Sequence, residues 1–196
     1  MSIELIFAVV VILGLIFYLI SIYNKLVSLK NRVDNGWAQI DVQLQRRYDL
    51  IPNLVETAKG YMKHEKETLK MVIDARNSAN DAAKAASSNP SDQNAIKDLQ
   101  ASEQKLQGAM MSFQALAEGY PDLKANTNML ALQEELATTE NKVGFSRQAF
   151  NDAVMQYNTG IEIFPNSLIA NQFKFTQATE WQIEDQEAKK NVKVTF

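Results

Sequence analysis

The side chains best suited to metal or cofactor chemistry are scarce in this sequence. His64 is the only histidine, and the chain of 196 residues has no cysteine. A zinc-binding helix of the H-E-x-x-H type needs a second histidine where Thr68 stands. A di-iron bundle needs Glu-x-x-His pairs, and the residue three before His64 is Tyr61. The sequence therefore predicts no metal site and no cofactor.

Catalytic arrangements are sparse as well. No serine lies in a G-x-S-x-G motif, no glycine-rich loop precedes a helix, and a Ser-His-Asp arrangement would have to use His64. We therefore expect no enzyme activity and no small-molecule substrate. The formal net charge of −3 also argues against a nucleic-acid partner, because nucleic acid requires a clustered basic surface.

Arg46 and Arg47 form the only adjacent arginine pair. They lie about 23 residues beyond Tyr23, which is roughly 35 Å along a continuous helix. Charges at that distance from a lipid surface are screened, since the Debye length is about 8 Å in physiological salt. Ion pairs with carboxylates of the same bundle are therefore favoured over anionic lipid. A contact with a protein partner is the alternative.

The first of the helices expected to position these side chains is apolar. The segment from Leu5 through Gly14 to Tyr23 carries no charge and reads LIFAVVVILGLIFYLISIY. About 20 apolar residues span roughly 30 Å, the thickness of the hydrocarbon core of a bilayer. We predict a transmembrane helix rather than a buried core helix. The lack of a basic leading region and of a small-x-small cleavage site favours its retention over cleavage as a signal peptide.

The charges that flank this segment predict its orientation. Lys25, Lys30 and Arg32 follow it, whereas only Glu4 and the amino terminus precede it. The positive-inside rule then places residues 1–4 outside and the rest of the chain in the cytoplasm. We expect a single-pass protein of the cell (inner) membrane.

Beyond Tyr23 the apolar residues recur at steps of three and four, the period of a helix. We expect this seam to contact later helices of the same chain; the alternative is a parallel coiled coil with another copy. The candidate seam for packing or self-association consists of Leu26, Leu29, Val33, Trp37, Ile40 and Leu44.

Three further amphipathic stretches follow, separated by turn signals. Pro52 predicts a kink or short break, and further turns are expected near Pro90 and at Gly119–Asp122. Four helices with short connections predict an all-α, long antiparallel four-helix bundle over residues 24–161. The expected helices are about 24–50, 52–86, 92–118 and 123–161.

The tail, residues 162–196, has no clean helical period at its start, and Phe164-Pro165-Asn166 is a turn signal. We expect an irregular strap whose aromatic side chains pack into a groove between helices. Pairing with a neighbouring copy is the alternative. The aromatic candidates for these contacts, or for a partner, are Phe173, Phe175 and Trp181; the alternation in Val192–Phe196 is strand-like.

Several ordered motifs closely resemble the signature of the LemA family. They are Asn31-Arg32-Val33, GWAQIDVQLQRRYDLIPNLVET at 36–57, YPDLKAN at 120–126, TTEN at 138–141, Phe150-Asn151, Tyr157-Asn158, Phe164-Pro165 and the final VKVTF. The resemblance implies a bacterial-type membrane protein with a short outer N-terminus, one span and a cytoplasmic antiparallel helical bundle. It implies no catalytic residue, cofactor or substrate.

Three functions remain in view. The first is a structural one, in which a stiff bundle self-associates and organises or shapes the membrane. The second is a membrane-tethered adaptor that recruits or accompanies another protein. An enzyme is the least favoured, because no catalytic motif is present.

Overall fold

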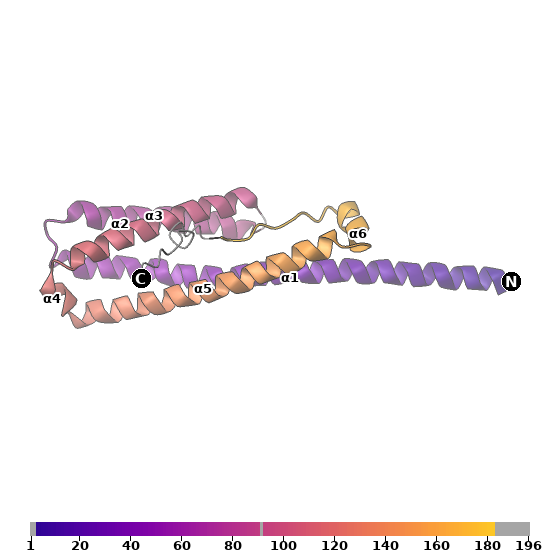
Figure 1. The fold of residues 1–196 in the computed structure, drawn as a ribbon, viewed down its shortest axis with the longest axis horizontal. Helices are drawn as coiled ribbons and strands as arrows, with labels where there is room; N and C mark the ends of the chain where they lie inside the picture. The colour runs from indigo at the N-terminus through magenta and orange to yellow at the C-terminus, as the bar shows by residue number, and fades with distance from the viewer. Residues whose placement is uncertain (1–2, 91, 183–196) are drawn as a thin grey trace, which may run out of the picture.

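The computed structural model describes residues 3–90 and 92–182, and this part of the chain is mostly helical, without a strand. The predicted all-α fold is confirmed. Figure 1 shows an elongated bundle from which one helix projects. In chain order the helices are α1 (Ile3–Lys59), α2 (Lys66–Ser88), α3 (Gln93–Ala117), α4 (Pro121–Lys124), α5 (Thr127–Glu162) and α6 (Asn166–Gln172).

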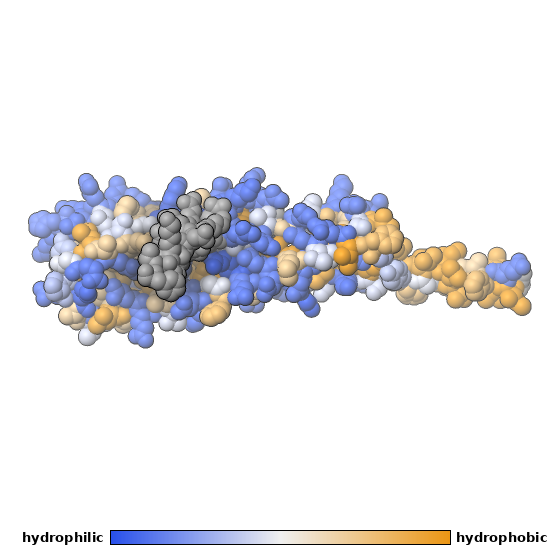
Figure 2. All heavy atoms as spheres, viewed as in Figure 1, coloured by the Kyte–Doolittle hydropathy of each residue, from blue (hydrophilic) through white to orange (hydrophobic). Residues whose placement is uncertain are grey.

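Helix α1 is continuous over 57 residues and joins the apolar segment to the bundle without a linker. Its first part projects beyond the other helices with its apolar side chains exposed, as Figure 2 shows. Its core-facing side is buried from Ile22 onward. Among the described residues, α1 is the one helix long and apolar enough to span a membrane.

The other helices are arranged around the second part of α1. Helix α5 runs antiparallel along it, and the hairpin of α2 and α3 packs on it from another side (Figure 1). Helices α1 and α5 approach each other closely at Gly36, where an added Cβ would lie 3.2 Å from Phe150 Cα. Their interior is filled by large buried side chains, including Trp37, Phe113 and Phe150.

Two of the helix starts follow from local capping. The Asp92 side chain accepts hydrogen bonds from the backbone N–H groups of Asn94 and Ala95. Asn126 accepts one from Met129 at the start of α5. Such caps satisfy N–H groups that have no partner within the helix. The predicted start of a helix near residue 92 is thereby confirmed.

The sequence predicts a kink or a short break at Pro52; the break is wrong, because α1 continues through Pro52 to Lys59. A proline lacks the N–H that would bond the carbonyl four residues earlier, here that of Tyr48. Arg76 of α2 replaces this donor, since its Nε donates to the Tyr48 carbonyl at 2.8 Å. Its guanidinium also lies 3.6 Å from a carboxylate oxygen of Asp49. A tertiary contact thus offsets the loss that predicts a break.

Several other helix boundaries also differ from those expected from the sequence. The second helix starts at Lys66 instead of residue 52, after a turn that includes His64. The expected helix 123–161 is divided into α4 and α5. The tail is not wholly irregular, since α6 lies within it beside α1 and α5. The strand-like Val192–Phe196 falls outside the described residues.

The contact between Arg76 and the Tyr48 carbonyl gives a first prediction. Arg76→Ala should lower the free energy of unfolding of the detergent-solubilised chain by about 2 kcal/mol, because it leaves a carbonyl without a donor and removes a charged hydrogen bond. In a Pro52→Ala background the residue 52 N–H can bond the same carbonyl. The cost of Arg76→Ala should then fall by about 1 kcal/mol, as measured in a double-mutant cycle by urea unfolding. An equal cost in both backgrounds would contradict this account of how α1 passes Pro52.

Candidate functional site

A charged cluster lies inside the bundle where α1, α3 and α5 meet. Arg47 of α1 donates to Glu103 of α3 through Nη2 and to Glu140 of α5 through Nη1, the second bond at 2.6 Å. The Tyr48 hydroxyl donates to the other carboxylate oxygen of Glu103. The side chains of Arg47 and Glu103 are each only 10% exposed. The cluster therefore connects three helices, with Arg47 and Glu103 buried and the Glu140 side chain 59% exposed at its outer edge.

The two adjacent arginines have different surroundings because successive residues of a helix point about 100° apart. Arg46 pairs with Glu135 at 2.6 Å, and both side chains are largely exposed. Both arginines therefore bond carboxylates of the bundle, and the predicted ion pairing is confirmed. The exposed pair contributes little to stability, whereas the buried one is sensitive to the loss of either partner.

The charge states of the cluster are fixed by its surroundings. Burial raises the pKa of Tyr48, and the neighbouring Glu103 carboxylate raises it further. Burial lowers the pKa of Arg47, but the carboxylates of Glu103 and Glu140 outweigh that effect, so the pKa lies above its usual value. Both side chains therefore remain protonated donors at neutral pH. They are suited to holding helices together and not to accepting a proton.

A second polar arrangement holds the docked segment, residues 174–182, against α5. The Asn158 amide donates to the Ala178 carbonyl and accepts from the Ala178 N–H, both at 2.9 Å. Asn151 does the same for Trp181, at 3.1 and 2.8 Å. Seven helical residues rise about 10.5 Å and three extended residues cover about 10 Å. The spacing of the two asparagines thus matches that of the two peptide units they bind.

Further contacts complete this attachment. The Tyr157 hydroxyl donates to the Thr176 carbonyl at 2.9 Å, and Gln100 of α3 donates to the Glu180 carbonyl at 3.3 Å. Trp181 is buried beside Trp37, with ring centroids 6.1 Å apart, and Trp37 packs edge-on against Phe150 at 5.6 Å. The docked segment therefore closes the core between α1, α3 and α5.

The tail aromatics have three different environments. Trp181 is buried, as expected of a strap that packs into a groove. Phe175 is half-buried and packs against the core. Phe173 is exposed and lies 4.8 Å from the ring of Tyr23.

The residues of the predicted seam lie inside this single chain. Leu29 is partly buried against the core and the other five are fully buried. The list is Leu26, Leu29, Val33, Trp37, Ile40 and Leu44. A parallel coiled coil through the seam would therefore require the bundle to open. Leu5, Gly14 and Tyr23 of the apolar segment are exposed.

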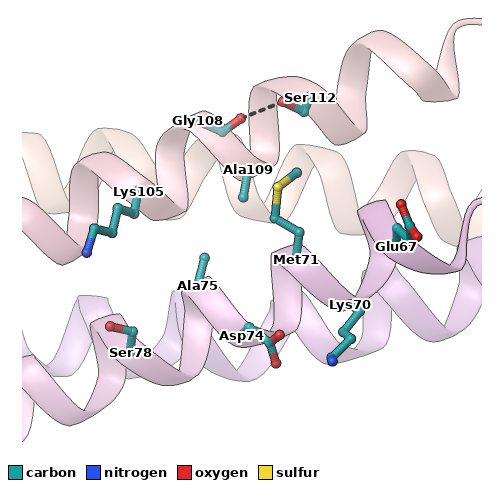
Figure 3. A pocket seen from close by; sticks show the side chains of 10 residues that line it. All are labelled: Glu67, Lys70, Met71, Asp74, Ala75, Ser78, Lys105, Gly108, Ala109 and Ser112. Atoms are coloured by element: carbon teal, nitrogen blue, oxygen red, sulfur yellow. Dashed lines mark hydrogen bonds between the residues drawn. The ribbon is translucent and has the colours of Figure 1, made fainter.

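A shallow groove of about 670 Å³ runs between α2 and α3 on the surface. Its floor is formed by small residues, Ala75 and Ala109, and Met71 extends across it from α2 (Figure 3). Lys70 and Lys105 lie at its edges with acidic and hydroxyl side chains. A mostly apolar groove with charged edges is suited to an apolar side chain of another protein.

No group of three or more metal-ligating side chains occurs within residues 3–90 and 92–182. His64 lies in the turn between α1 and α2. The described part of the chain thus offers polar clusters whose visible role is to hold its helices and docked segment together.

The family comparison covers most of this architecture. The LemA family model matches residues 36–196. The chain belongs to the LemA family. The matched range contains the charged cluster and the docked segment, and it begins after the apolar segment. A similar protein, Protein LemA of Metamycoplasma hominis, is 24% identical over 157 residues, which cover 79% of this chain and 67% of the relative.

Sequence patterns alone do not reveal three important residues of this LemA-family chain. Glu103 gives a partial signal, because it falls on the apolar stripe of α3 between Leu99 and Leu106, where a carboxylate needs a partner. Asn151 and Asn158 recur in Phe-Asn and Tyr-Asn pairs, but their seven-residue spacing acquires meaning only beside an extended segment. The seven-residue spacing of the two asparagines is the one sequence feature that points to them.

Glu103→Gln should lower the free energy of unfolding by about 3 kcal/mol, because it leaves the buried Arg47 without one of its two charged partners. The matched control is Glu135→Gln, which breaks the exposed pair with Arg46 and should cost at most about 1 kcal/mol. Urea unfolding of the detergent-solubilised chain measures both. Similar costs at the two positions would show that the buried cluster does not secure the bundle.

Replacing both asparagines by alanine should release the docked segment without unfolding the helices. Trp37 and Trp181 are the only tryptophans, and both are buried, so iodide should quench the native fluorescence poorly. The Asn151→Ala/Asn158→Ala variant should show a red shift and quenching of part of the emission, with helical circular dichroism retained. Asn171→Ala, at an exposed position, is the control and should leave both signals unchanged. Unaltered quenching in the double variant would refute the role of the asparagines.

Proposed function

We propose that this LemA-family chain is a non-enzymatic scaffold anchored in the cell (inner) membrane by residues 5–23. The observation that supports this most is the continuity of α1, which carries the apolar segment into the core of the bundle without a linker. The depth and tilt of the anchor therefore determine the position of the bundle, and any movement of the anchor moves the bundle with it. The basic residues Lys25, Lys30 and Arg32 support a bundle in the cytoplasm and an N-terminus outside.

Self-association is part of this proposal, and its location differs from the seam expected from the sequence. Because the seam is occupied within the chain, contacts between copies use outward surfaces. Exposed apolar side chains on such surfaces include Val42 of α1 and Phe145 of α5. Copies that meet along these faces would form an array of parallel rods that organises or shapes the membrane.

An adaptor that recruits or accompanies another protein is the second candidate. The groove between α2 and α3 favours it, because Met71 is exposed there over a floor of small residues. Methionine-lined surfaces adapt readily to apolar side chains of different shapes. In this case the anchored bundle would hold its partner at a set distance from the membrane.

Single cysteines can test both candidates, because the chain has none of its own. The variants are Phe145→Cys on α5 and Met71→Cys in the groove, expressed in cells and treated with a short bifunctional thiol reagent before the membranes are washed with carbonate. The scaffold predicts that the intact chain stays in the membrane pellet and that Phe145→Cys gives homodimers. Val72→Cys, at a buried position, is the control and should give no product.

Other outcomes decide against the scaffold. Release of the intact chain by carbonate would remove the anchor, and so would a mature chain that begins near Asn24. A purely monomeric Phe145→Cys band would count against self-association through α5. A single stoichiometric product between Met71→Cys and one other protein, without homodimers, would favour the adaptor.

A further inference from the structure

Exposed apolar side chains gather where α5 ends and α6 begins. This corner, residues 163–173, presents Phe164 at 81% exposure, the second most exposed of the large apolar side chains in the described chain. Ile163, Leu168 and Phe173 are also exposed. An apolar cluster of this kind on a soluble surface is unfavourable and commonly marks a contact with protein or membrane.

The corner lies at the end of the bundle that faces the apolar segment. Helix α6 packs beside α1, at the point where α1 leaves the bundle (Figure 1). Tyr23, the last residue of the apolar segment, lies 4.8 Å from Phe173 and 5.8 Å from Phe175 between ring centroids. In Figure 2 the apolar surface continues from the projecting helix onto this end of the bundle.

A close contact between helices holds the corner at this level. A Cβ on Gly160 would lie 2.5 Å from Leu29 Cδ1, so the missing side chain lets the end of α5 approach α1. The buried Asn166 side chain donates to the Gly160 carbonyl at 3.0 Å and secures the start of α6. The position of the corner along α1 is therefore set by packing.

The chemistry of the corner matches the layer next to the hydrocarbon core. A bilayer has about 5–7 Å of headgroup region on each side of that core, and aromatic side chains are enriched there. With residues 5–23 in the core, Tyr23 lies at this boundary, and Phe173 of the corner lies beside it. Lys25, two residues after Tyr23, and Lys174, next to Phe173, are exposed, which suits anionic headgroups.

We propose that the α5–α6 corner is a second membrane contact, which inserts Phe164 and Leu168 into the headgroup layer beside the anchor. The inference rests on the proposed anchoring and adds to it a fixed point of the bundle on the lipid surface. The occupant is lipid because the apolar surface of the corner is continuous with that of the anchor.

Nitroxide labels on single cysteines measure the depth of this contact. The full-length variants Phe164→Cys and Leu168→Cys are reconstituted in vesicles of phosphatidylethanolamine and phosphatidylglycerol. Collisions with oxygen, which concentrates in lipid, are compared with collisions with a water-soluble nickel complex. Leu13→Cys is the reference within the anchor. Met155→Cys is the aqueous reference, exposed on α5 roughly 12 Å before the corner.

Oxygen should be favoured at positions 164 and 168, at least threefold over position 155 in the ratio of the two collision rates, with Leu13→Cys higher still. If Leu13→Cys is deep but 164 and 168 match 155, the corner contact is wrong and the anchor stands. Labels at 164 and 168 shielded from both reagents would indicate a protein cover and would also overturn the proposal. If Leu13→Cys itself is aqueous, the anchoring has failed and the corner contact with it.

Discussion

The fold depends on a single helix, α1, whose two parts present different surfaces. From Ile22 onward, one side of α1 is buried by α2, α5 and α6, while the preceding part presents apolar side chains on all sides. A helix that is apolar all round requires an apolar environment, and a helix with one apolar side requires a partner. Because both requirements fall on one unbroken backbone, the position of the bundle is tied to that of the apolar segment.

The buried charges secure what apolar packing alone leaves free. Apolar contacts are non-directional and tolerate sliding of one helix along another. The bonds from Arg47 to Glu103 and Glu140 hold α1, α3 and α5 at one level, and Asn151 and Asn158 hold the docked segment at another. Each of these groups would be costly to bury without its partner. The range matched by the LemA family model, residues 36–196, contains the residues that form both arrangements.

The helices themselves could be predicted from periodicity, because each buries one side and short polar turns separate most of them. The passage of α1 through Pro52 could not, since the donor that replaces the missing N–H is Arg76, which only the tertiary fold brings to Tyr48. The period of the seam is compatible with a partner in the same chain, which we expected, and also with one in another copy. Periodicity identifies an apolar side and does not identify what covers it. Glu103 can be recognised in the sequence as a carboxylate on the apolar side of α3. Its partner Arg47 is identified only by the way the helices pack.

The absence of a linker after Tyr23 has a mechanical consequence. The part of α1 from residue 24 to residue 59 is roughly 54 Å long, so a change of about 10° in the tilt of the proposed anchor, residues 5–23, would displace its far end by roughly 9 Å. Helices in bilayers tilt to match the thickness of the surrounding lipid. With the proposed anchor in place, a small difference in bilayer thickness would therefore produce a large lateral displacement of the far end of the bundle.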